Sequence, residues 1–263
     1  QEGREWVERV RTCDRGSVPV RARLLLALAF LRMYSFSLDS LEAEEESLRL
    51  YRGLANERRF AGCLSFRALL EATWGDRENA RAWAREALAI SETMGYDSVT
   101  AVCLLTLGVL EGSTAPGVAH LEASVVVARR CGNLWGRGWA AWDLGMMLFD
   151  YGDHERARVM IAESRRVFQE VGCRWAQTWS METLGKALFA GGHFGAARAL
   201  YEESRALRRE LKDRRGEADA LLNAGRAARD EGDTAAARVC FSEVRQLAAA
   251  LDDQPLLVAA LHN

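Results

Sequence analysis

The side chains best suited to binding a ligand are tryptophans concentrated in one stretch of the chain. Five of the eight tryptophans lie between residues 135 and 179, and they recur 40 residues apart, Trp135 with Trp175 and Trp139 with Trp179. Large aromatic rings dominate many recognition surfaces, and a few polar groups beside them orient the ligand. Lys186, one of only two lysines, follows this stretch. The pattern therefore indicates a groove for a peptide or a small ligand.

Residues that could perform catalysis or bind a metal do not cluster. The four histidines are scattered, no HExxH or GxSxG motif occurs, and the six cysteines include no CxxC pair. Such cysteines are typical of small buried apolar residues in a reducing compartment. Runs of acidic residues such as Glu202-Glu203 have arginines nearby, which favours charge pairing on exposed helix faces. We expect no enzymatic activity, no catalytic residue, no metal and no cofactor.

The composition is that of an ordinary soluble protein. The 263 residues are 49% hydrophobic and 27% charged, with a net charge of −2, so no basic surface for nucleic acid is expected. No apolar run reaches the roughly 18 residues of a membrane span, and no signal peptide is recognisable. These features predict a cytoplasmic segment without direct contact to nucleic acid or membrane. Because the sequence lacks an initial Met and begins within a helical pattern, we expect a fragment of a longer chain.

The elements that position the tryptophans follow from an internal repeat of 40 residues. Glycine recurs at 152, 192 and 232 and again at 145, 185 and 225, and alanine recurs at 157, 197 and 237. Self-similarity at one fixed period is typical of a solenoid of stacked units. The first glycine set is expected in the turn between two helices, with Asp153 and Asp233 as caps. The second set lies within a helix, where the absence of a side chain lets the partner helix approach.

Apolar residues recur at helical spacing almost everywhere, and no stretch alternates as a strand would. The predicted fold is all-α: a right-handed superhelical solenoid of antiparallel helix pairs, forming one domain over residues 1–263. Its parts are an N-terminal helix within 1–18, six pairs over 19–55, 56–95, 96–132, 133–172, 173–212 and 213–252, and a capping or truncated helix over 253–263. We predict individual helices over 2–13, 19–35, 38–54, 57–74, 77–94, 97–111, 115–131, 134–150, 153–171, 174–190, 193–211, 214–230, 233–251 and 254–262.

The predicted groove is the face that the first helix of each pair turns away from its partner. Taking Gly145 and its equivalents as packing positions, the candidate partner-binding residues are Trp139, Trp142, Asp143, Met146, Phe149, Trp179, Glu182, Lys186, Phe189, Asn223 and Arg226. The alternative is that the tryptophans only fill the space between neighbouring helices. Lys186 is expected to be exposed, or paired with Glu182 one turn earlier.

The small and large residues of each unit resemble the tetratricopeptide repeat. Met181, Leu184-Gly185, Ala197, Tyr201 and Ser204 match the family pattern, and residues 19–252 are covered. The unit is 40 residues long rather than 34, and the usual proline at its end is missing. The resemblance implies stacked helix pairs whose inner surface binds a partner.

Long repeats of this kind are similar to the C-terminal sensor regions of bacterial STAND-class ATPases and of related LuxR-type and AfsR-type transcription regulators. This resemblance implies an upstream NTPase domain in the full-length chain, although no GxxxxGK[ST] motif occurs here. It implies a non-catalytic sensor that binds a protein or peptide partner, or a small-molecule effector. Two alternatives stay open: a constitutive protein scaffold, and the repeat segment of a kinase or cyclase whose catalytic domain is absent.

Overall fold

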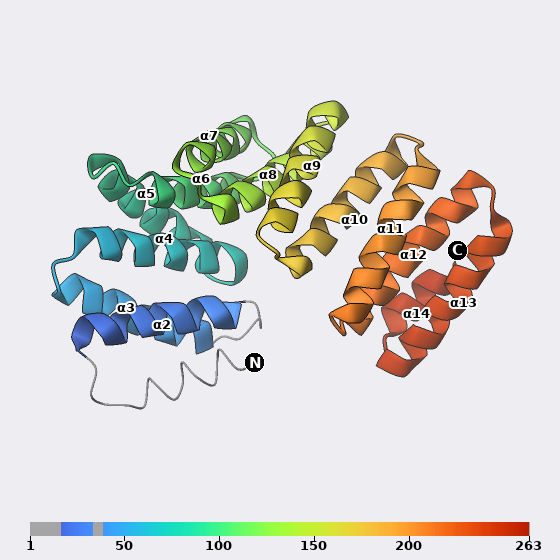
Figure 1. Cartoon of the computed structure of the whole chain (residues 1–263), viewed down its shortest axis with the longest axis horizontal. Helices are drawn as coiled ribbons and strands as arrows, with labels where there is room; N and C mark the ends of the chain where they lie inside the picture. Colours follow the sequence, from blue (N-terminus) through green and yellow to red (C-terminus); the bar gives the residue numbers. More distant parts are fainter. Residues whose placement is uncertain (1–16, 34–38, 263) are drawn as a thin grey trace. The chain divides into compact units, whose positions relative to one another are not determined.

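The computed structural model describes residues 17–33 and 39–262, and this part of the chain contains thirteen α-helices and no strand (Figure 1). The helices are α2 (Val18–Met33), α3 (Asp39–Gly53), α4 (Glu57–Trp74), α5 (Arg77–Thr93), α6 (Asp97–Glu111), α7 (Ala115–Cys131), α8 (Leu134–Asp150), α9 (His154–Glu170), α10 (Arg174–Ala190), α11 (Phe194–Glu210), α12 (Arg214–Glu231), α13 (Thr234–Leu251) and α14 (Gln254–Leu261). Every boundary lies within two residues of its prediction. The predicted helix over 2–13 lies outside the described residues. The all-helical prediction is therefore confirmed for the part that is described.

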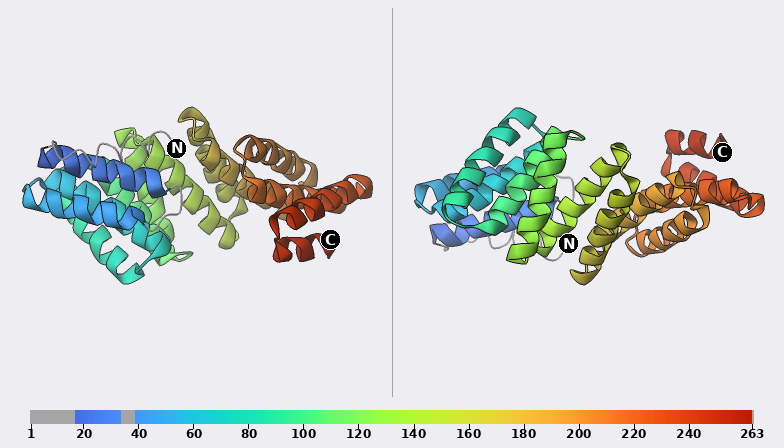
Figure 2. Two further views of the ribbon diagram at one scale, coloured as in Figure 1. Left: turned by 90° about the horizontal axis from the view of Figure 1, so that it is seen from below. Right: turned by 90° about the horizontal axis from the view of Figure 1, so that it is seen from above.

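The chain divides into two compact units, residues 1–136 and residues 137–263. In the first unit, α2 pairs with α3, α4 with α5, and α6 with α7, and apolar side chains such as Tyr51, Leu64 and Val99 share one core cluster. In the second unit, α10, α11, α12 and α13 follow one another as packed antiparallel helices (Figure 2), and α14 packs on α13. Each unit is thus a stack of helix hairpins.

The turns within the helix pairs of the second unit use the predicted chemistry. Gly152, Gly192 and Gly232 have φ values of +84°, +77° and +97°, the left-handed region in which a side chain is unfavourable. The carboxylate of Asp153 accepts a hydrogen bond from the backbone N–H of Arg156 at 3.2 Å, and Asp233 caps α13 in the same way. Glycine therefore ends the first helix of each of these pairs, and aspartate caps the second helix in two of them, as the repeat predicted; His193 at the equivalent position of α11 provides no side-chain cap.

Successive second helices are joined by ion pairs that recur at the repeat period. Arg165 on α9 donates to both carboxylate oxygens of Glu203 on α11 at 2.7 Å. Forty residues later, Arg205 on α11 pairs with Glu243 on α13. Glu202 pairs with Arg198 on its own helix. The acidic residues at 202 and 203 are therefore used for charge pairing, as the sequence indicated.

Candidate functional site

The first helix of each pair in the second unit carries a set of side chains that keep part of their surface in solvent. We call this set the A-helix face, and it comprises the eleven residues predicted to line the groove. Ten of these side chains are half-buried and Lys186 is exposed. On α8 the half-buried positions 139, 142, 143 and 146 alternate with fully buried ones such as Ala140, Ala141 and Leu144, the helical spacing of a surface-facing stripe. None of the eleven is fully buried, as expected for side chains that can contact a partner.

Four tryptophans of α8 and α10 form one ring network. The ring centroids of Trp139 and Trp142 are 5.8 Å apart, those of Trp142 and Trp179 are 5.3 Å apart, and those of Trp179 and Trp175 are 4.6 Å apart. The Trp142 indole N–H donates a hydrogen bond to the Thr183 hydroxyl at 3.0 Å. These contacts fix the rings across two neighbouring helices.

The network is anchored in the interior of the second unit. The Trp139 ring meets Phe168 of α9 edge to face, with centroids 5.2 Å apart, and Phe168 is 1% exposed. Each of the four tryptophans nevertheless keeps part of its surface in solvent. The same rings therefore pack against the core and present a partly exposed aromatic surface.

Asp143 lies between Trp139 and Met146 on α8, and it is the acidic residue of this surface without a counter-charge. Within the described chain its carboxyl group has no hydrogen-bond or ion-pair partner, and burial raises its pKa to about 7. Desolvation alone accounts for this shift because it disfavours the charged form. The carboxyl group is therefore divided between neutral and ionised forms near neutral pH.

We expect Asp143→Asn to stabilise the protein at high pH. Because the folded-state pKa lies above the unfolded value, the unfolded chain ionises first as the pH rises, and folding is penalised increasingly between about pH 4 and pH 7. The amide removes this penalty, so the free energy of unfolding should increase by roughly 1–2 kcal/mol at pH 8. This is less than the whole pKa shift would correspond to, because the partly exposed carboxyl group is screened by solvent. Urea unfolding at pH 4 and pH 8 measures the effect. Equal stability of the two proteins at both pH values would contradict it, and the exposed Glu155→Gln is the control.

Glu182 and Lys186 are not paired with each other. Both carboxylate oxygens of Glu182 are held by Arg208, at 2.6 and 3.0 Å, and one of them also accepts a hydrogen bond from Ser204 at 2.7 Å. Lys186 is exposed and has no ion-pair partner in the described chain. Of the two alternatives for Lys186, exposure is therefore the one observed, and Glu182 is committed to packing within the unit.

Of the remaining predicted residues, two pack at the turn between the helices of a pair and three lie partly exposed on the same face. Phe149 contacts His154, with centroids 4.9 Å apart, and the equivalent Phe189 contacts Phe194 at 5.2 Å, so both phenylalanines brace the turn to the second helix. Met146, Asn223 and Arg226 are half-buried on the same face. The aromatic network and Asp143 thus form the part of the A-helix face with the most distinctive chemistry.

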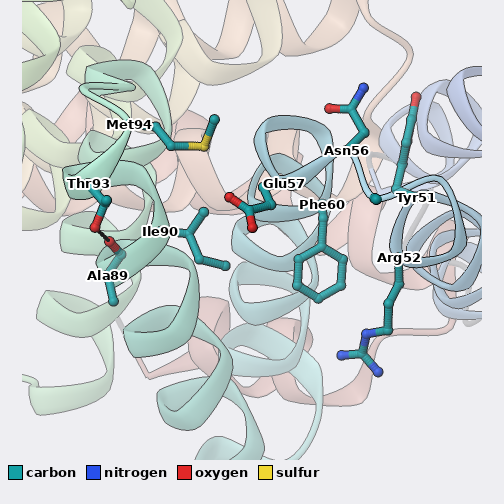
Figure 3. Close-up of a pocket in the computed structure, with 10 residues that line it drawn as sticks. Tyr51, Arg52, Asn56, Glu57, Phe60, Ala89, Ile90, Thr93 and Met94 are labelled. Carbon is teal, nitrogen blue, oxygen red and sulfur yellow. Dashed lines mark hydrogen bonds between the residues drawn. The ribbon is translucent and has the colours of Figure 1, made fainter.

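A cavity that the sequence did not reveal lies in the first unit. It has a volume of about 530 Å³ and is formed by the end of α3, the start of α4 and the last turns of α5 (Figure 3). Its lining is mixed, with Phe60 and Ile90 facing each other beside Glu57 and Arg52, and the Arg52 guanidinium lies 4.9 Å from the Phe60 ring centroid. The repeat pattern is weakest around α3, so no periodic signal indicated this cavity.

The described residues contain neither a metal-binding cluster nor a membrane-spanning helix. No group of three or more histidine, cysteine, aspartate or glutamate side chains there could hold a metal ion. None of the described helices combines the length and apolar character needed to cross a membrane.

Comparison with known proteins supports the helix-pair fold. Residues 136–210 match the tetratricopeptide repeat family model. A search of curated proteins found no match. The fold is similar to that of a Signal Transduction ATPase with Numerous Domains (STAND) protein with a tetratricopeptide repeat sensor from Pyrococcus horikoshii, with a TM-score of 0.72 and 14% identity. That alignment covers 91% of this chain and 37% of the STAND protein, so the chain spans little more than a third of its length.

Two further solved structures share the fold. A Rap protein complexed with competence and sporulation factor aligns over 90% of this chain and 68% of its own, with a TM-score of 0.66 and 18% identity. The type IV pilus biogenesis factor PilW aligns over 91% of this chain and 98% of its own, with a TM-score of 0.65 and 18% identity. At these identities the comparisons establish a tetratricopeptide-like helical solenoid.

Proposed function

We propose that this chain is a non-catalytic recognition module that binds a protein or peptide partner on its A-helix face. The observation that carries this proposal is the network of half-buried tryptophans joining α8 to α10. Exposed parts of tryptophan rings are frequent centres of binding energy at interfaces. Because ring contacts already hold these side chains in place, a partner would order few of them on binding, and affinity would benefit.

The wider context we propose is the sensor segment of a larger bacterial regulator with an upstream NTPase domain. The similarity in fold to a STAND protein whose repeats are described as a sensor supports this context. In such a protein, a partner bound across α8 and α10 would favour the spacing of helix pairs that it fits best. Regulation requires the partner to bind one arrangement of the helix pairs more tightly than another, because a ligand that binds both equally does not change their populations.

The test measures partner affinity in two independent variants of the A-helix face. A partner captured with the native chain is titrated calorimetrically against Trp139→Ala/Trp179→Ala and against Lys186→Glu. We expect each variant to weaken binding by at least about tenfold, or roughly 1.4 kcal/mol. Lys186 is exposed, so its substitution leaves the core intact. If the tryptophan variant unfolds, the Lys186→Glu protein still tests the proposal.

The matched control is Trp83→Leu, a half-buried tryptophan of α5 in the first unit that lies outside the A-helix face. The Trp83→Leu protein should bind the partner with the same affinity as the native chain. If folded Trp139→Ala/Trp179→Ala and Lys186→Glu proteins both bind the partner with native affinity, the A-helix face is not the binding surface. Circular dichroism verifies that each variant is folded.

A further inference from the structure

Asp143 differs from every comparable acidic residue of the second unit. Eight other aspartates and glutamates there are at least half-buried, and each has an arginine within 4.0 Å: Asp153, Glu163, Glu182, Asp213, Glu217, Asp219, Glu243 and Asp253. Asp143 alone has none. The unit therefore pairs its half-buried carboxylates with arginine consistently and omits the arginine at one position.

An unpaired carboxyl group in this environment is unfavourable for folding. Removing a carboxylate from water without a compensating charge or hydrogen bond costs free energy. The raised pKa of Asp143 expresses the same cost. A positively charged group supplied from outside the chain would restore the pairing that the other eight carboxylates already have.

The side chains around Asp143 favour one kind of cation. Trp139 precedes Asp143 by one helical turn and Met146 follows it by three residues, so the three side chains share a face of α8. Trp142 is adjacent in sequence, and its indole is held in place by Thr183. A guanidinium group is planar and permanently charged, stacks on indole rings, and can donate to both oxygens of a carboxylate.

We propose that Asp143 binds an arginine side chain of the partner, whose guanidinium group stacks against the Trp139 ring, one helical turn away on the same face of α8. This inference rests on the proposed function and specifies its chemistry. The partner segment would present arginine to α8, and Asp143 would take the place that intramolecular arginines occupy at the other half-buried carboxylates. Recognition at this position therefore depends on charge, whereas the rest of the aromatic network contributes apolar contact.

The test compares two peptides that differ only in charge. Acetylated and amidated Ala-Arg-Ala is titrated into the ¹⁵N-labelled chain at pH 8, and the indole N–H resonances of Trp139 and Trp142 are followed by NMR. The citrulline peptide Ala-Cit-Ala has nearly the same shape and no charge. We expect the arginine peptide to shift these resonances with at least tenfold higher affinity than the citrulline peptide, and Asp143→Asn to abolish the difference. Glu155→Gln, which removes an exposed charge of α9 outside this face, should retain the preference.

Each other outcome overturns the proposal. If both peptides shift the indole resonances equally, the A-helix face binds peptide independently of its charge. This result would contradict the role proposed for Asp143 but not the proposed function. If Asp143→Asn keeps the preference for arginine, another acidic group provides the charge. If neither peptide shifts the resonances, arginine is not recognised, and the proposed function is judged by the partner affinities of the Lys186 and tryptophan variants. Asparagine has nearly the shape of aspartate, so the variant is expected to fold.

Discussion

Arg208→Met is expected to lower the free energy of unfolding by about 3–5 kcal/mol, the usual cost of removing one partner of a buried ion pair. Arg208 of α11 is 7% exposed and joins three helices, because its guanidinium holds Glu182 in the middle of α10 and Asp213 at the start of α12. Without it, Asp213 still accepts a hydrogen bond from the backbone N–H of Gly216. Glu182 keeps only the Ser204 hydroxyl, and its charge stays largely uncompensated.

Two further variants isolate the charge effect in urea unfolding experiments. Glu182→Met/Arg208→Met removes both charges and should recover a large part of the loss, since apolar side chains of similar volume often replace buried pairs well. Arg158→Met breaks an exposed pair with Glu155 and should cost less than about 1 kcal/mol. If Arg208→Met costs no more than Arg158→Met, the buried pair does not stabilise the fold as described.

Gly145→Val should lower the free energy of unfolding by about 2–3 kcal/mol, because the added carbons have no space. A Cβ atom at Gly145 would lie 2.5 Å from Cγ1 of Ile161 and 3.2 Å from the carbonyl oxygen of Ala157. Ile161 is fully buried, and the carbonyl belongs to the backbone of α9. The α8–α9 hairpin would have to open to accommodate valine, which thermal unfolding followed by circular dichroism would detect.

Gly62→Ala is the control for Gly145→Val because it also lies within a helix. Its added Cβ atom would meet only Cγ2 of Val99, at 3.9 Å, an ordinary contact. Alanine is favoured over glycine within helices, so this variant should gain up to about 1 kcal/mol. If Gly145→Val were as stable as the native protein, close helix approach would not explain the glycine at this position.

The sequence predicted the fold well because the repeat supplies several aligned copies of each position. Gly145, Gly185 and Gly225 each face a bulky residue of the second helix, Ile161, Tyr201 and Phe241. A position that is small in every copy and faces a large residue in every copy has one simple explanation, close packing. The same alignment predicted a stripe that faces away from the second helix, and all eleven residues retain exposure. Trp139 and Glu182 nevertheless contact the second helix of their own pair, at Phe168 and Arg208, which the alignment did not predict.

The Arg208–Glu182 pair could not be predicted because it occurs in one copy only. The positions equivalent to Arg208 are Phe168 and Ala248, and those equivalent to Glu182 are Trp142 and Leu222. An arginine in a charged stretch and a glutamate 26 residues earlier carry no signal of their pairing. The sequence predicted which tryptophans lie on this face, but it did not predict that their rings contact one another. Side-chain rotamers decide whether neighbouring tryptophans touch.

The ion pairs between successive second helices would be preserved if residues 173–212 were duplicated. This segment contains an acceptor for the preceding arginine, Glu203, and a donor for the following glutamate, Arg205. A second copy placed directly after residue 212 would present its own Glu203 to Arg205 of the first copy, and its own Arg205 to Glu243. Gly185 and Tyr201 would travel together inside each copy. A chain lengthened by this unit would therefore keep its ion pairs between second helices, whereas the contact of Arg208 with Asp213 would occur only at the last copy.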